Sequence, residues 1–232
     1  MTLVSYVLGH FVAYISSLTV EQFSIWLYGY PSKFLLQDVE SMHYWRVSDS
    51  NVGRMGKMCK YIWKFIISIF LFPLTVCSLL FAKLLGVKYF FIKKLDAALI
   101  DAINAKTHEL KSFLKINDDE NMDNHRVIYH YEYEQQKVHA VKMDNYVALY
   151  GFLRSITLVF NCFSLYLIYI AILSFDVDYY ADWKFIRLLL LSILVSYLFF
   201  MGFMKFYRRF TLESFMCLII DTSYVKEQKN RS

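Results

Sequence analysis

Three stretches of the chain lack any charged residue over a length that matches a lipid bilayer: residues 65–82, 155–175 and 188–204. An α-helix rises 1.5 Å per residue, so about 20 apolar residues cross the hydrocarbon core. The chain of 232 residues is also 57% hydrophobic, which exceeds the roughly 45–50% typical of soluble domains. We therefore predict an all-α integral membrane protein in which these three stretches are membrane helices.

The charges that flank these stretches predict the orientation. The connection at residues 176–187 is short and holds three aspartates against Lys184 and Arg187, whereas only lysines and arginines are counted at the far ends of the two helices that it joins. The positive-inside rule then places this connection outside and residues 87–152 and 206–232 in the cytoplasm.

Residues 3–28 leave two topologies open. If they also cross, there are four membrane helices and both termini are cytoplasmic; if they do not, the first 60 residues lie outside. We favour four helices, because all four tryptophans then lie at or near the outer interface. Against this choice, the basic residues of the segment 37–60 would also lie outside. A cleaved signal peptide is disfavoured, since no lysine or arginine precedes the apolar stretch.

The predicted organisation follows from these placements. In order along the chain the segments are a first membrane helix with a Gly-Tyr-Pro break (1–36), an external loop (37–60), a second membrane helix (61–86), a cytoplasmic segment (87–152), a third membrane helix (153–175), a short external loop (176–187), a fourth membrane helix (188–205) and a cytoplasmic helix with a tail (206–232). Pro73 lies inside the second helix, where a kink is expected.

The cytoplasmic segment predicts a small platform that is mostly helical. Apolar residues recur at helical spacing over residues 88–116, and the acidic stretch 117–124 reads as a solvated turn. Residues 126–134, RVIYHYEYE, alternate in a way that predicts one short strand. The strand would place His130, Glu132 and Glu134 on one face, near His125 and His139. No zinc-like spacing supports them, so we expect no metal.

No motif in the sequence indicates catalysis. It contains no nucleophile elbow, metal-binding helix or glycine-rich dinucleotide turn, and its four cysteines lack the CxxC pattern. The net charge of +5 is too dispersed to indicate nucleic acid. We therefore expect a protein that is not an enzyme, has no catalytic residue and no cofactor, and makes no direct contact with nucleic acid.

The candidate functional residues lie on the first helix. At 100° per residue, His10, Tyr14, Ser17 and Glu21 fall close to one line, which also includes Tyr28. Ionisable residues inside a membrane are costly and usually functional. We predict that this polar stripe lines a pore or meets another polar surface, with Glu21 near the outer end of the helix.

Small and polar residues predict close packing between helices. Gly9 and Ala13 lie beside the stripe at a spacing that permits close helix approach. On the third and fourth membrane helices, the candidates for packing and for hydrogen bonds between helices are Asn161, Ser164, Ser192 and Ser196.

In size and layout the chain resembles the small four-helix inner-membrane subunits of bacterial anti-phage defence systems of the Kiwa or Hailong type. The resemblance covers architecture and size and implies a bacterial inner-membrane protein. The polar stripe, the cytoplasmic amphipathic helices and the absence of a catalytic motif predict a homo-oligomer that couples an event at the bilayer to a cytoplasmic partner or opens a pore. We expect that partner to contact residues 87–143 and 206–232. The alternatives are a small transporter or membrane enzyme, and a toxin-immunity or phage-exclusion protein.

Overall fold

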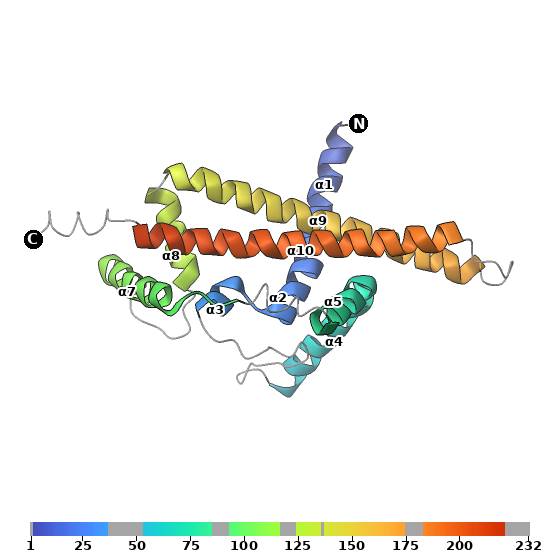
Figure 1. The fold of residues 1–232 in the computed structure, drawn as a ribbon, viewed down its shortest axis with the longest axis horizontal. Helices are drawn as coiled ribbons and strands as arrows, with labels where there is room; N and C mark the ends of the chain where they lie inside the picture. The colour runs from blue at the N-terminus through green and yellow to red at the C-terminus, as the bar shows by residue number, and fades with distance from the viewer. Residues whose placement is uncertain are drawn as a thin grey trace, which may run out of the picture. The chain divides into compact units, whose positions relative to one another are not determined.

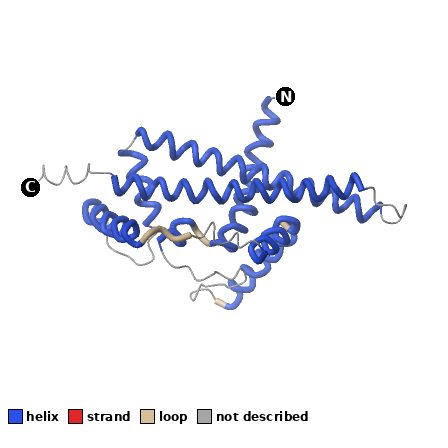
Figure 2. Tube along the Cα trace, viewed as in Figure 1, coloured by secondary structure: helices blue, strands red, loops and turns tan. Residues whose placement is uncertain are grey.

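A computed structural model describes residues 2–36, 53–84, 93–116, 124–135, 137–174 and 183–220. All regular structure within these ranges is helical (Figure 2). Figure 1 labels the α-helices. In chain order, the elements of the described residues are α1 (Thr2–Ser16), the π-helical turn η1 (Ser17–Glu21), α2 (Gln22–Tyr28), α3 (Pro31–Leu36), α4 (Arg54–Phe70), α5 (Phe72–Leu84), α7 (Ala97–Leu114), α8 (Asn124–Gln135), α9 (Lys137–Ser174) and α10 (Trp183–Ile220). The predicted loop residues 37–52 and 176–182, most of the acidic turn and the C-terminal tail lie outside the described residues.

Three helical segments among the described residues are long and apolar enough to cross a membrane: Leu3–Leu36, His139–Leu173 and Trp183–Ile220. The pair α4 and α5 makes a fourth if it counts as one span, although the two helices are bent by 92°. The prediction of an all-α protein with three to four long apolar helices is thus confirmed. Helix α4 begins at Arg54, inside the segment that the sequence assigned to the external loop.

The chain divides into two compact units. Unit 1 holds residues 1–29, 39–91 and 149–205, and unit 2 holds residues 30–38, 92–148 and 206–232. Helices α9 and α10 each contribute to both units.

The break between α4 and α5 occurs at Leu71, two positions before Pro73. Proline has no backbone N–H and clashes with the preceding turn, so the hydrogen-bond ladder cannot continue through it. The Leu71 amide bonds to the Ile67 carbonyl at 2.8 Å, and the Thr75 amide restarts the ladder on the Leu71 carbonyl at 2.8 Å. The predicted kink is therefore a sharp turn between two helices.

In unit 1, aromatic rings form the centre of the core. Phe200 of α10 is fully buried, and its ring packs near Phe23 (5.9 Å between centroids) and Tyr28 (6.3 Å) of α2. Tyr197 packs against Phe81 of α5 at 4.9 Å. These contacts tie α2 and α5 to the same stretch of α10.

In unit 2, the predicted strand is wrong: residues 124–135 form helix α8. Ile128 and Glu132 are buried, and the four-residue interval between them is one helical turn. The ring of Tyr129 packs on that of Phe210 of α10, with 5.3 Å between the centroids. Burial raises the pKa of the Tyr129 phenol, and the nearby Tyr133 and Asp144 raise it further. Packing against α10 thus overrides the alternating pattern, which covers too few residues to specify a strand.

A backbone hydrogen bond joins α3 to the segment before α7. The Leu95 amide donates to the Leu35 carbonyl at 3.1 Å, and both residues belong to unit 2. The sequence placed residues 37–60 outside and residues 87–152 in the cytoplasm. Residues 35 and 95 are therefore direct neighbours, and the side of a membrane on which each segment lies stays a prediction.

Candidate functional site

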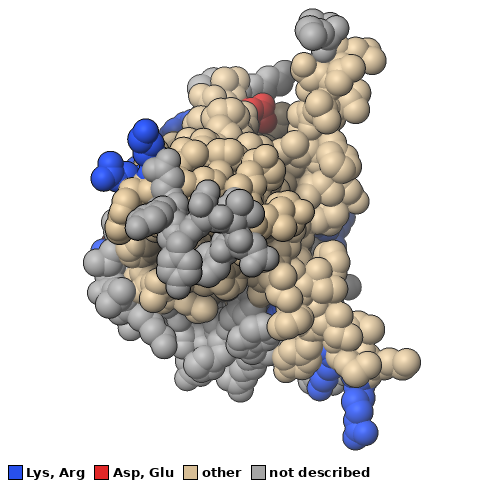
Figure 3. Space-filling view, turned by 90° about the vertical axis from the view of Figure 1, so that its right-hand side faces the viewer, with Lys and Arg blue, Asp and Glu red and all other residues tan. Residues whose placement is uncertain are grey.

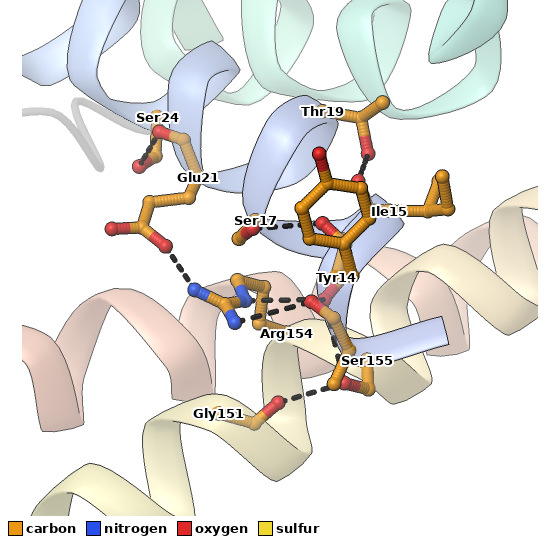
Figure 4. A network of polar contacts seen from close by, with 11 residues as sticks. Tyr14, Ile15, Ser17, Thr19, Glu21, Ser24, Gly151, Arg154 and Ser155 are labelled. Atoms are coloured by element: carbon orange, nitrogen blue, oxygen red, sulfur yellow. Dashed lines mark hydrogen bonds and ion pairs between the residues drawn. The ribbon is translucent and has the colours of Figure 1, made fainter. Parts of the chain in front are cut away.

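The most unusual polar site in unit 1 joins η1 to α9 (Figure 4). Arg154 forms an ion pair with Glu21 through its Nη1. The same guanidinium donates from Nε to the Ser16 hydroxyl at 3.1 Å and from Nη2 to the Ala13 carbonyl at 3.3 Å. The two charged side chains are only 12% (Arg154) and 25% (Glu21) exposed. With these three partners, Arg154 holds the first helix against α9 at one position along both helices.

The π-helical turn positions Glu21 for this contact. A π turn inserts one residue into the helix and so rotates every later side chain about the axis. Hydroxyl groups bond back to carbonyls of the preceding turn: Ser17 donates to Tyr14 at 2.7 Å and Thr19 to Ile15 at 2.8 Å. Such back-bonding favours local bending and satisfies carbonyls at an irregular turn.

The predicted polar stripe is not one continuous face. His10 and Tyr14 are exposed, and the His10 ring packs only on Tyr6 among the described ring contacts, at 4.4 Å between centroids. Glu21 faces Arg154, and Tyr28 is 2% exposed within the core. The π turn is the reason, because the 100° rule assumes an α-helix throughout.

The small residues of α1 have different surroundings. A Cβ atom on Gly9 would meet nothing within 4 Å, so this position contacts no other described helix. By contrast, Ala13 lies next to α9, because its carbonyl accepts a hydrogen bond from Arg154. One turn further along, the Ser16 hydroxyl lies 3.4 Å from the Ser155 hydroxyl. A role of Gly9 in close helix packing stays a prediction for contacts between copies.

The four polar residues proposed for helix packing are all buried. The hydroxyl groups of Ser164 and Ser192 lie 2.8 Å apart between α9 and α10, and Ser196 donates to the Thr157 carbonyl at 3.1 Å. These hydrogen bonds define the register of the α9–α10 pair in unit 1.

Asn161 has a different partner from the serines. Its Nδ2 donates to the Phe70 carbonyl at 2.9 Å. In an unbroken helix that carbonyl would accept from residue 74, but the helix breaks at Leu71. Asn161 therefore satisfies a carbonyl close to the break and attaches the α4–α5 corner to α9.

Replacing Asn161 by leucine should destabilise unit 1 by about 1–3 kcal/mol, the cost of leaving a partly buried carbonyl without its donor. Unfolding in mixed micelles by titration with dodecyl sulfate measures the change. Cys162→Ala, at the adjacent exposed position, is the matched control. Equal stability of the two variants would refute the role given to Asn161.

A second polar cluster lies in unit 2, between α9 and α10. Lys142 forms an ion pair with Glu213, and His139 Nδ1 lies 3.8 Å from the same carboxylate oxygen. The potential ligand atoms of His139, Glu213 and Cys217 lie within 4.8 Å of one another, the one such group of three among the described residues. Because the Lys142 ammonium already occupies the carboxylate, we interpret the group as an ion-pair cluster.

Sequence reasoning missed the partners in both sites. Arg154 was used only as a marker of orientation, and Glu213 and Cys217 were not considered beside His139. Both pairs join residues far apart in sequence, so no local spacing reveals them. The available signal was the isolation of Glu21 and Arg154, which are single opposite charges at the edges of apolar stretches. Such charges are costly in a membrane unless they pair.

Comparison of the chain with protein-family models, curated proteins and solved structures finds no match in any of the three.

Proposed function

We propose that the chain is a non-enzymatic membrane sensor or effector that transmits a change in its membrane helices to a cytoplasmic partner. The continuity of α9 and α10 carries this proposal. Each is an unbroken helix of 38 residues that begins in one unit and ends in the other. A shift or rotation of such a helix in the membrane moves its other end as well, because hydrogen bonds join every turn to the next.

The Glu21–Arg154 ion pair is the element that we propose changes state. Coupling between two sites needs an element with two arrangements that each site can bias. Here the arrangements are an intact pair, with η1 held against α9, and a broken pair, with α1 released. The lysine of the unit 2 cluster, Lys142, lies on the same helix as Arg154. Movement of α9 therefore reaches both sites.

The location proposed for the protein is a bacterial inner membrane, with unit 2 in the cytoplasm. The support is the basic residues that follow the apolar stretches in sequence, at 83–94 and 205–209. Residues 87–143 and 206–232 would then offer the surface for a cytoplasmic partner. The resemblance in size and layout to anti-phage defence subunits is the reason for proposing a role in defence ahead of transport, toxin immunity or phage exclusion.

Lipid or further copies of the chain would cover the remaining apolar surface. Residues 3–11 of α1 are exposed on every side of the helix. The face seen in Figure 3 also carries few charged side chains among the described residues. A helix that is apolar all round and exposed is typical of a membrane span. We propose a homo-oligomer in which α1 meets lipid or the same helix of another copy.

Hydrogen exchange of the full chain in nanodiscs tests the coupling. We expect Arg154→Gln to raise amide exchange near Glu21 and also in residues 124–135 and 206–220 of unit 2, because release of η1 changes the position of α9. Lys106→Gln, which breaks an exposed ion pair with Glu109, is the control and should change only α7. A change confined to residues 13–24 and 150–160 would contradict the coupling.

The defence role needs a separate experiment. Plating phage on a bacterial host that expresses the chain with its neighbouring genes should give fewer plaques, and Arg154→Gln should restore them. A pore would be favoured instead if the purified protein conducted ions and His10→Ala lowered that conductance.

A further inference from the structure

We infer that α4 lies flat in the cytoplasmic surface of the membrane and binds the headgroups of anionic phospholipids. Six of its large apolar residues share one face, within an arc of about 100°: Met55, Met58, Ile62, Phe65, Ile66 and Ile69. All six are exposed, from 49% for Ile66 to 79% for Met55. Among the residues that the structure describes, none buries this face.

The basic residues of α4 occupy a separate arc of about 120°: Arg54, Lys57, Lys60 and Lys64. A helix with lysine and arginine on one face and large apolar residues on the other is typical of a helix that lies in the membrane interface. A helix that crosses the bilayer would instead carry these four charges through or beside hydrocarbon, at a cost of about 2.5–3.5 kcal/mol each at the bilayer centre.

The bend supports the same orientation. Helices α4 and α5 meet at 92°, so at most one of them stands along the membrane normal. The basic residues exclude α4 from that direction. Helix α4 therefore lies closer to the membrane plane than to the membrane normal.

The contact between Leu35 and Leu95 gives an independent reason. It places the chain before α4 and the chain after α5 on one side of the membrane, so the segment between them crosses an even number of times. Residues 37–53 carry several charges in the sequence, which makes a crossing there costly. The 41 residues from 54 to 94 would reach about 61 Å as one helix, and two crossings of roughly 30 Å each leave no residues for the turn between them. We therefore infer that this segment does not cross.

The contacts of α4 place it beside the end of the first membrane helix. The Lys64 ammonium lies 5.5 Å from the centre of the Trp26 ring, and Trp26 precedes the helix end at Gly29 by one turn. Tryptophan favours the membrane interface. The Trp26 contact therefore sets α4 at interfacial depth.

Charge identifies the lipid. The inference rests on the orientation proposed above, in which residues 93–96 are cytoplasmic, so α4 meets the leaflet that is rich in anionic lipid. The residues Arg54, Lys57 and Lys60 then obey the positive-inside rule, which they violate in an external loop. The N-terminus of α1 consequently lies outside, and Glu21 lies at the inner end of its helix, level with Arg154.

Spin labels test the flat placement. Labels at Met58→Cys, Ile62→Cys, Phe65→Cys and Ile69→Cys, in the full chain with its native cysteines replaced by serine, report depth through the ratio of oxygen to nickel accessibility. We expect depths that agree within about 3 Å, whereas a crossing helix deepens by about 16 Å from Met58 to Ile69. A steady increase in depth would overturn the placement. Labels shielded from both reagents would indicate a protein neighbour and overturn it as well.

Lipid selectivity tests the headgroup contact and needs no cysteine changes. The probes are spin-labelled phosphatidylglycerol and phosphatidylcholine in mixed vesicles of the two lipids. Neutralising Arg54, Lys57 and Lys60 together to glutamine should lower the preference for phosphatidylglycerol by at least about fivefold, the factor expected from one basic side chain near an anionic surface. The control neutralises Lys93, Lys106 and Lys115 of unit 2. An equal effect of both triple variants would refute the contact, and neither experiment depends on signal transmission through α9.

Discussion

Replacing Arg154 by methionine is expected to lower the free energy of unfolding of unit 1 by about 3 kcal/mol. Breaking a buried pair by removing one partner leaves the other charge without compensation, at a cost of about 3–5 kcal/mol. The lower end applies because Glu21 keeps 25% of its side chain exposed. Glu21→Gln should cost less, since Arg154 retains the Ser16 hydroxyl and the Ala13 carbonyl as acceptors.

A double-mutant cycle separates the pair from its surroundings. If the two charges depend on each other, Arg154→Met combined with Glu21→Gln should be more stable than the sum of the single losses predicts, by about 2 kcal/mol. Titration with dodecyl sulfate in mixed micelles gives the four stabilities. The exposed pair Lys106–Glu109, treated in the same way, should show a coupling below about 0.5 kcal/mol. Additive losses at Glu21 and Arg154 would mean that the ion pair contributes nothing.

The helices that cross the membrane follow from composition, since a charge-free run of about 20 residues has few other stable environments. The predicted runs at 155–175 and 188–204 lie within α9 and α10. Their full extent was not predictable in the same way, because residues on either side are polar and remain helical only through packing between α9 and α10. The ion pair between Lys142 and Glu213 belongs to that packing, and a hydrogen bond from Tyr133 to Asp144 adds a contact between α8 and α9.

The strand at residues 126–134 was wrong because it was read from periodicity, which reports local conformation only. The polar stripe on the first helix was read from periodicity in the same way. Ile128 and Glu132 face inward because α8 packs on α10, and Glu21 reaches Arg154 after a π turn. Neither the partner helix nor the inserted residue leaves a trace in the local pattern.

The second membrane helix was assigned from residues 65–82 alone, where hydropathy is highest. That window excludes Arg54, Lys57 and Lys60, so the amphipathic character of α4 did not enter the assignment. Pro73 signalled a break, but a single proline does not specify an angle. The 92° bend depends on contacts such as that of Asn161 with the Phe70 carbonyl.

Phe200→Ala is expected to lower the free energy of unfolding by about 3–4 kcal/mol, the usual loss for removing a fully buried phenylalanine. The ring is fully buried and lies within reach of Phe23, Tyr28, Tyr197 and Phe203. The cavity would separate α2 from α10, so amide exchange should rise most in residues 22–28.

Two further substitutions at this part of α10 test whether packing is the cause. Phe200→Leu keeps much of the volume and should lose less than about 1.5 kcal/mol. Leu198→Ala removes a side chain that is 58% exposed and should cost under about 1 kcal/mol, because lipid replaces the lost contacts. If α2 exchange were unchanged in Phe200→Ala, the aromatic core would not hold the first helix, and the polar contacts around Glu21 and Arg154 would have to do so. Loss of stability without α2 release would therefore strengthen the case for the ion pair as the attachment of the first helix to α9.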